Sequence, residues 1–216
     1  MLGVNKLSFT GFSQKDFDIF AVTGLDERME LIRGNIQPKF QDIGQVLVDE
    51  LSMKLGNEMY LHIAKHARRT VNPPKDTWLA IANNKRGYKK HPHFQVGLFD
   101  DHVFIWLAFI YELPNKKEIG QALIKNINLI KDVPNDYVIS LDHMQKGSFS
   151  VTETEEMEKG LARFRDTKKG EFLIGKHFDQ NNPVLKNGEQ FTQIVKDAFE
   201  TLIPIYKISL VGEGHI

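Results

Sequence analysis

Hydrophobic residues in the first quarter of the chain recur every three or four positions, the spacing of a helix with one buried face. Ser13 and Asp16 have the spacing of a capping arrangement at a helix start. Pro38 suits the first turn of a helix, and Gly56 suits the position after its last turn. We therefore predict three helices here: one that follows Ser13, one over residues 26–33 and one from Pro38 to Gly56.

The period changes to two from residue 58 onward, which is typical of half-buried strands. Apolar and polar positions alternate in EMYLHIAKH, and the apolar run HVFIWLAFIYE suits a central strand. Asp100 and Asp101, just before that run, indicate a tight hairpin turn. The pattern predicts about six strands, over residues 58–66, 77–83, 93–99, 102–112, 137–142 and 171–178.

Helical spacing returns between and after the later strands. One helix is predicted over residues 119–130, Thr152 is predicted to cap a second, and Asn187 to cap a final, strongly periodic one. The elements predict an α+β fold, a single domain over residues 1–210 in which a mostly antiparallel sheet packs against N- and C-terminal helices. We expect residues 211–216 to be a disordered or vector-derived tail.

Composition narrows the classes of protein that fit this pattern. The longest apolar run, residues 103–111, is far shorter than the ~20 residues of a membrane-spanning helix, so no membrane partner is predicted. The chain has no cysteine, which excludes disulfides, thiolate metal sites and a cysteine nucleophile. The first residues lack the pattern of a secretory signal, and we therefore expect a cytoplasmic protein.

The net charge of zero conceals a strong segregation of charge along the chain. Residues 62–93 contain eight Lys and Arg against one acid, Asp76, and so carry a formal charge of +7. Four of the eight histidines also lie in this segment, and the rest of the chain carries −7. Such segregation creates a local field even in a neutral molecule. The segment 62–93 is therefore the main functional clue in the sequence.

Two basic clusters, HIAKHARRTVNPP and NNKRGYKKHPHFQ, flank the predicted strand TWLAIAN. Their donors suit phosphate or carboxylate, and Trp78, Tyr88 and Phe94 could stack on a base or ring. The alternative is that they line solvated loop ends and pair with acids elsewhere in the chain. On the first interpretation the ligand-binding residues are Arg68, Arg69, Lys85, Arg86, Tyr88, Lys89, Lys90, His91 and His93.

Three residues are candidates for proton transfer. His62 and His66 belong to the first basic cluster, and Glu112 lies at the end of the most apolar strand, where it would face the basic segment. Glu112 also has an ordinary structural explanation as a strand-end acid. Asp142 and His143 are neighbours in a predicted strand, where they would point to opposite faces, so we do not expect them to act as an acid–base pair.

The histidine spacings do not predict a metal site. On a continuous strand His62 and His66 would lie ~13 Å apart, too far to share an ion. A helical turn near Lys65 would bring them closer, but carboxylates or water would still have to complete the site. His91 and His93 would lie about 6.6 Å apart on one strand face, without a third ligand. We predict neither a metal nor a cofactor.

Common catalytic motifs, including phosphate loops, dinucleotide fingerprints and the zinc-protease helix, do not occur. The strings HARRTVNPP and KRGYKKHPHFQ, with GLDERME upstream and ISLDH downstream, resemble the YktB-like family of uncharacterised bacterial proteins. The likeness covers most of the chain. It implies a compact α+β cytoplasmic protein and brings no reaction, substrate or catalytic residue with it.

Three hypotheses for function follow from the basic segment. The first is a binding protein for a phosphorylated or otherwise anionic ligand, an anionic small molecule or nucleic acid. The second is an enzyme acting on an anionic small molecule, with His62 or His66 as acid or base and arginines that stabilise developing negative charge. The third is an interaction protein that docks an acidic partner or self-associates through unlike patches. All three depend on whether the two basic clusters form one site.

Overall fold

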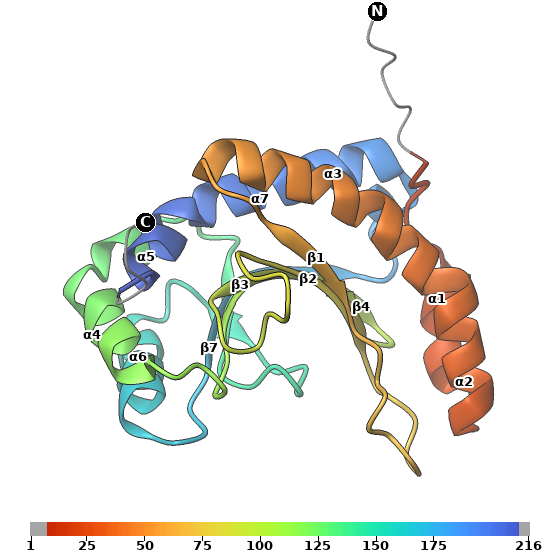
Figure 1. The fold of residues 1–216 in the computed structure, drawn as a ribbon, viewed down its shortest axis with the longest axis horizontal. Coiled ribbons are helices and arrows are strands. Elements are labelled where there is room, and N and C mark those ends of the chain that lie inside the picture. Colours follow the sequence, from red (N-terminus) through yellow and green to blue (C-terminus); the bar gives the residue numbers. More distant parts are fainter. Residues whose placement is uncertain (1–7, 212–216) are drawn as a thin grey trace, which may run out of the picture.

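A seven-stranded antiparallel sheet organises the fold in the computed structural model, which describes residues 8–211 (Figure 1). The strand order is β1-β2-β3-β4-β7-β5-β6, and every neighbouring pair is antiparallel. The strands are β1 (Tyr60–Ile63), β2 (Thr77–Ala82), β3 (His93–Leu98), β4 (His102–Phe109), β5 (Val138–Ser140), β6 (Phe149–Ser150) and β7 (Phe172–Asp179). The predicted α+β class with a mostly antiparallel sheet is confirmed, and the unpredicted seventh strand, β6, has only two residues.

Helices cover one face of this sheet. Figure 1 shows α3 and α7 lying across it, with α4 and α6 at the end of the sheet that carries β7. The helices are α1 (Gln14–Asp18), α2 (Leu25–Leu31), α3 (Gln37–Leu55), α4 (Lys116–Lys125), α5 (Asn128–Lys131), α6 (Thr154–Asp166) and α7 (Gly188–Ser209). None of the helices within residues 8–211 is long and apolar enough to cross a membrane.

Local signals place most helix ends where the sequence predicts them. The Ser13 backbone N–H donates to the Asp16 carboxylate at 2.7 Å, which forms the expected capping box. Gly56 ends α3 in the left-handed conformation with φ 73°. The Asn187 side chain accepts a hydrogen bond from the Gln190 backbone N–H at 3.0 Å and so caps α7.

Several predicted boundaries differ from the structure. The single helix predicted over residues 119–130 is divided by a turn at residues 126–127 into α4 and α5. The chain does not leave the helical conformation before α3, because a π-helical turn, Ile32–Ile36, joins α2 to α3 with both of its end residues fully buried. Thr152 does not cap α6; Glu153 is the residue before the helix, and Thr152 lies in a turn that the Ser150 hydroxyl holds. Residues 212–216 of the predicted tail lie outside the described residues.

The two faces of the sheet differ because strand side chains alternate. One face, with Leu79, Val96 and Ile105, packs under the helices in the main core. The opposite face, here called the open face, has loops but no helix across it in the part of the chain that Figure 1 describes. It carries aromatic, polar and histidine side chains in register across five strands: His62, Trp78, His93, Gln95, Phe104, Trp106 and His177.

Candidate functional site

The two basic clusters come together through a loop rather than through strand register. The first cluster follows β1 and the second follows β2, so they leave the sheet at opposite ends of β2. The β2–β3 loop, residues 83–92, folds back over the open face. There the Trp78 indole N–H donates to the Tyr88 hydroxyl at 3.1 Å, and the Tyr88 ring lies 5.6 Å from that of His62. Both clusters therefore border one surface.

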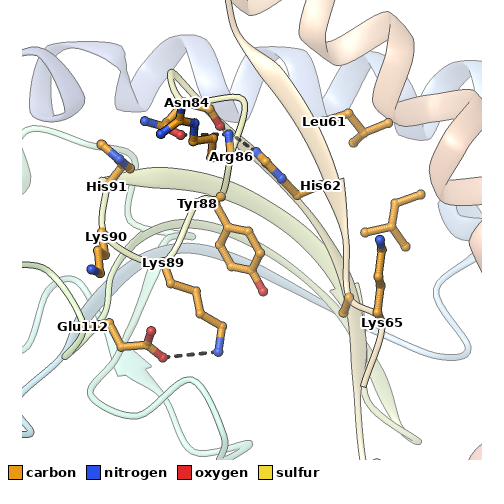
Figure 2. Close-up of a pocket in the computed structure, with 13 residues that line it drawn as sticks. Leu61, His62, Lys65, Asn84, Arg86, Tyr88, Lys89, Lys90, His91 and Glu112 are labelled. Atoms are coloured by element: carbon orange, nitrogen blue, oxygen red, sulfur yellow. Dashed lines mark hydrogen bonds and ion pairs between the residues drawn. The ribbon is translucent and has the colours of Figure 1, made fainter. Parts of the chain in front are cut away.

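That surface is hollowed into three adjoining cavities, which share lining residues and are together called the basic groove. The first cavity, of about 790 Å³, lies between β1 and the 83–92 loop, with the Tyr88 ring projecting into it (Figure 2). The central cavity, of about 570 Å³, shares Tyr88 and Lys89 with the first. The third, of about 850 Å³, shares Arg69 and Met144 with the central cavity. Volumes of this size are typical of small-molecule sites.

Most cations of the two basic clusters have no acidic partner within residues 8–211. Of the seven Lys and Arg residues of the two clusters, only Lys89 makes an ion pair, with Glu112 at 3.2 Å (Figure 2). The unpaired ones are Lys65, Arg68, Arg69, Lys85, Arg86 and Lys90. The acids in the rest of the described chain thus do not neutralise the segment, and the groove keeps an excess of positive charge.

Not every predicted ligand-binding residue lines the groove. Arg68, Arg69, Arg86, Tyr88, Lys89, Lys90 and His91 do, whereas Lys85 is exposed outside the three cavities. Phe94 does not reach the groove at all. Its ring lies in the core on the other face of the sheet, 4.7 Å from Phe199 and 5.1 Å from Tyr206. Trp78 and Tyr88 are therefore the aromatic residues of the predicted set that can contact a ligand there.

His93 is a structural residue rather than a free ligand. It is fully buried, its Nδ1–H donates to the His91 carbonyl at 2.8 Å, and its Nε2 accepts from the Gln95 amide at 2.8 Å. Burial lowers the pKa of His93 to about 3, so its ring is neutral. Because both of its nitrogens are engaged, His93 does not share an ion with His91.

His62 and His66 occupy different cavities. His62 lines the first cavity and its Nε2 lies 2.9 Å from the Asn84 carbonyl, to which it donates (Figure 2). Burial lowers its pKa. His66 lines the central cavity, where its Nε2 lies 3.2 Å from the Thr77 hydroxyl. Burial and then the nearby Arg69 charge lower the pKa of His66 to about 4. His66 is therefore neutral near pH 7, as a proton acceptor must be.

The central cavity contains an acid–base pair that the sequence does not predict. β5 ends at Ser140, so His143 lies in a turn and not in the expected strand. The His143 ring Nδ1 lies 2.8 Å from a Glu171 carboxylate oxygen, and the His143 backbone N–H donates to the same oxygen at 2.8 Å. Burial alone would lower the pKa of His143, but the hydrogen bond and charge of Glu171 outweigh it and raise the pKa. Burial alone would raise the pKa of Glu171, but the hydrogen bond and charge of His143 outweigh it and lower the pKa.

Enough ligand atoms to hold a metal ion are offered by three neighbouring residues, Asp142, His143 and Glu171. One donor atom from each lies within 4.8 Å of the others. The Glu171 carboxylate, however, already accepts hydrogen bonds from the His143 ring and from the backbone N–H groups of His143 and Tyr111. These bonds account for the cluster without an ion. We assign His143 and Glu171 as an ion pair.

Asp76, the one acid of the basic segment, does not line the central cavity but is close enough to His143 and Arg69, which do, for their charges to act on it. It is 1% exposed, and neither carboxylate oxygen has a hydrogen-bond partner in the described chain. Burial raises the pKa of Asp76 to about 6, although the charges of His143 and Arg69 pull it down. A buried carboxylate without hydrogen bonds is costly, and such groups concentrate at functional sites.

Comparisons with known proteins agree on one family. A family model described as a domain of unknown function (DUF1054) matches residues 12–206. A UPF0637 protein of Oceanobacillus iheyensis is 60% identical over 200 residues, which cover 93% of this chain and 97% of the relative. A UPF0637 protein of Shouchella clausii is 58% identical, with 94% and 96% covered, and one of Exiguobacterium sibiricum is 52% identical, with 92% and 98% covered.

Proposed function

Because this chain belongs to the uncharacterised bacterial family DUF1054, whose description assigns no activity, we propose a function from the groove itself: a cytoplasmic protein that binds a phosphorylated ligand. The observation that carries this proposal is the meeting of two basic segments, separate in sequence, on one groove with unpaired cations on both walls. A site that gathers cations without neutralising them attracts anions.

The chemistry of the lining favours phosphate among anions. Arg68 and Arg69 line the central cavity and Arg86 the first, and guanidinium groups match the geometry of phosphate oxygens in two-point hydrogen bonds. Trp78 lines the central cavity, Tyr88 lines both cavities, and the two offer aromatic surface for a ring. A ligand with both phosphate and a planar ring, such as a nucleotide or a short oligonucleotide, uses both features.

Removing one arginine from each wall is expected to weaken binding strongly. In the double variant Arg68→Ala/Arg86→Ala, two charge-assisted hydrogen bonds are lost, each worth about 1.5–3 kcal/mol. We expect Kd for a fluorescein-labelled mononucleotide or hexanucleotide to rise by roughly 100-fold or more. Fluorescence anisotropy titration measures Kd, and affinity of the unmodified protein should fall steeply between low and high salt.

A matched control removes two cations from outside the groove. Lys125 and Lys207 are exposed in the last turns of α4 and α7, so Lys125→Ala/Lys207→Ala changes net charge equally without touching the cavities. This variant should keep Kd within a factor of about two, because distant exposed charges are largely screened. Equal loss of affinity in both double variants would show nonspecific attraction, and no binding of either probe at low salt would overturn the proposal.

A further inference from the structure

Two histidines face one space in the central cavity. His66 and His143 both line it, and both rings contact the Trp78 indole in T-shaped geometry, with centroids 5.5 Å and 6.3 Å away. Arg68 and Arg69 line the same cavity. Two groups able to carry a proton and two fixed cations are thus placed around a volume of about 570 Å³. These are the kinds of groups that acid–base catalysis on a bound anion uses.

The surroundings give the two histidines opposite protonation states. His66 is partly buried and has Arg69 as a charged neighbour, so its pKa falls to about 4 and the ring is neutral. His143 is faced by carboxylates from three directions: Glu171 before β7, Asp76 before β2 and Asp142 in its own turn. These outweigh its burial and raise its pKa, which favours the cation. Environments that separate two pKa values in this way define a base and an acid.

Hydrogen bonds leave one nitrogen of each ring available. Glu171 engages Nδ1 of His143, so the remaining proton is on Nε2, which has no hydrogen-bond partner in the described chain and is not among its buried unpartnered atoms. We assign Nε2–H of His66 as the donor to the Thr77 hydroxyl, which leaves the Nδ1 lone pair free to accept a proton.

The backbone at His66 supports a functional role for this position. His66 has φ 49°, and it is the single residue other than glycine with positive φ within residues 8–211. This conformation is unfavourable for a side-chain-bearing residue, and such strain concentrates at ligand sites. It turns the chain from the end of β1 over the open face, and the His66 ring reaches Trp78.

The position of the central cavity within the groove indicates the kind of substrate. It adjoins the first cavity at Tyr88 and Lys89 and the third cavity at Arg69 and Met144. A phosphate at the centre could therefore carry one substituent into each neighbouring cavity, of about 790 and 850 Å³. A phosphodiester has two such substituents, whereas a phosphomonoester has one.

Resting on the proposed phosphate binding, we propose that the central cavity hydrolyses a phosphodiester, with His66 as general base, His143 as general acid and Glu171 as its positioning residue. His66 Nδ1 takes a proton from water as the water oxygen bonds to phosphorus. The bond from phosphorus to one ester oxygen breaks, and that oxygen takes the Nε2 proton of His143. The products are a phosphomonoester and an alcohol, and solvent returns His66 to its neutral and His143 to its charged form. Arg68 and Arg69 stabilise the negative charge that builds on the phosphoryl oxygens.

Two substrates of different leaving group test the two roles separately. A ribo- or deoxyribodinucleotide releases an alkoxide that needs a proton, whereas bis(p-nitrophenyl) phosphate releases a nitrophenolate that does not. His143→Gln, which keeps a hydrogen bond to Glu171, should lower dinucleotide cleavage by about 100-fold or more and nitrophenyl ester cleavage far less. His66→Asn, a residue that tolerates positive φ, should slow cleavage of both. His177→Gln, on the open face but outside the groove lining, should change neither rate.

The pH profile distinguishes positioning by Glu171 from a purely structural role. The rate should rise as His66 loses its proton near pH 4 and fall as His143 loses its proton above its ordinary value of 6.5. Glu171→Gln removes the carboxylate charge, so the descending limb should move to lower pH. An unmoved limb, or His143→Gln cleaving the dinucleotide as fast as the unmodified protein, would overturn these roles.

Anisotropy titration in parallel separates this inference from the proposed function. If the unmodified protein binds the labelled probes but cleaves neither substrate between pH 4 and 9, the hydrolysis proposal fails and phosphate binding stands. If it neither binds nor cleaves, both proposals fail. His66→Asn and His143→Gln should keep Kd for the labelled hexanucleotide within about tenfold, because the arginines that bind phosphate are unchanged.

Discussion

Glu171→Ala is expected to destabilise the folded protein by about 3–5 kcal/mol, since it removes one partner of a buried ion pair. Glu171 is 3% exposed, and without it the His143 ring and the backbone N–H groups of His143 and Tyr111 lose their acceptor. Urea denaturation near pH 5.5 measures the loss. Glu158→Ala, which breaks the exposed pair between Glu158 and Lys131, serves as the control and should cost less than about 1 kcal/mol.

The pH dependence of that loss identifies the ion pair as its cause. The pKa of Glu171 is lowered below its ordinary 4.5, so its stabilising contribution is present above pH 4.5 and disappears as pH falls through the folded-state pKa. The pKa of His143 is raised above 6.5, so its contribution is present below pH 6.5 and disappears as pH rises through the folded-state value. The difference between the unmodified protein and Glu171→Ala should therefore be largest between about pH 4.5 and 6.5. A difference independent of pH would instead indicate loss of packing alone.

The sequence predicts those parts of the fold that local chemistry determines. Ser13 with Asp16, Gly56 and Asn187 each satisfy backbone groups within a few residues, and the structure places all three helix ends accordingly. Alternating and continuous apolar runs likewise identify six of the seven strands. The π-helical turn Ile32–Ile36 escapes prediction because it depends on what Ile32 and Ile36 pack against, and β6 escapes it because two residues carry no period.

The candidate site is predicted only in part, for a related reason. Residues 62–93 stand out by charge alone, but their meeting depends on the 83–92 loop folding back over the open face, where Tyr88 bonds to Trp78. His143 and Glu171 are 28 residues apart, and they meet because β5 pairs with β7, with Ser140 opposite Leu173. Because the sequence predicts a strand through Asp142 and His143, it gives no reason to pair His143 with Glu171. Alternation along β7 does, however, place Glu171 on the open face.

The same nonlocal packing buries Asp76, and Asp76→Asn is expected to stabilise the protein by about 3 kcal/mol at pH 8. Burial raises the pKa of this carboxyl from 3.8 to about 6, so the folded state holds the proton more tightly than the unfolded state. Stability therefore falls as pH rises from about 4 to 6, and the full cost of the buried charge remains above pH 6. Asn keeps the size of the protonated acid without the charge. Urea denaturation should show almost no difference between the two proteins at pH 4 and the largest at pH 8.

Asp132→Asn, at an exposed position with no ion pair in the described chain, is the matched control and should change stability by less than about 0.5 kcal/mol at either pH. If Asp76→Asn destabilises the protein at pH 8, the buried carboxylate is held by favourable contacts and its burial does not lower stability. If it stabilises, Asp76 lowers folding stability at pH 8, as groups at functional sites often do. Its negative charge favours protonated His143, so the variant should also move the descending limb of dinucleotide hydrolysis to lower pH. Greater stability together with a narrower pH range would link this buried acid to the chemistry of the groove.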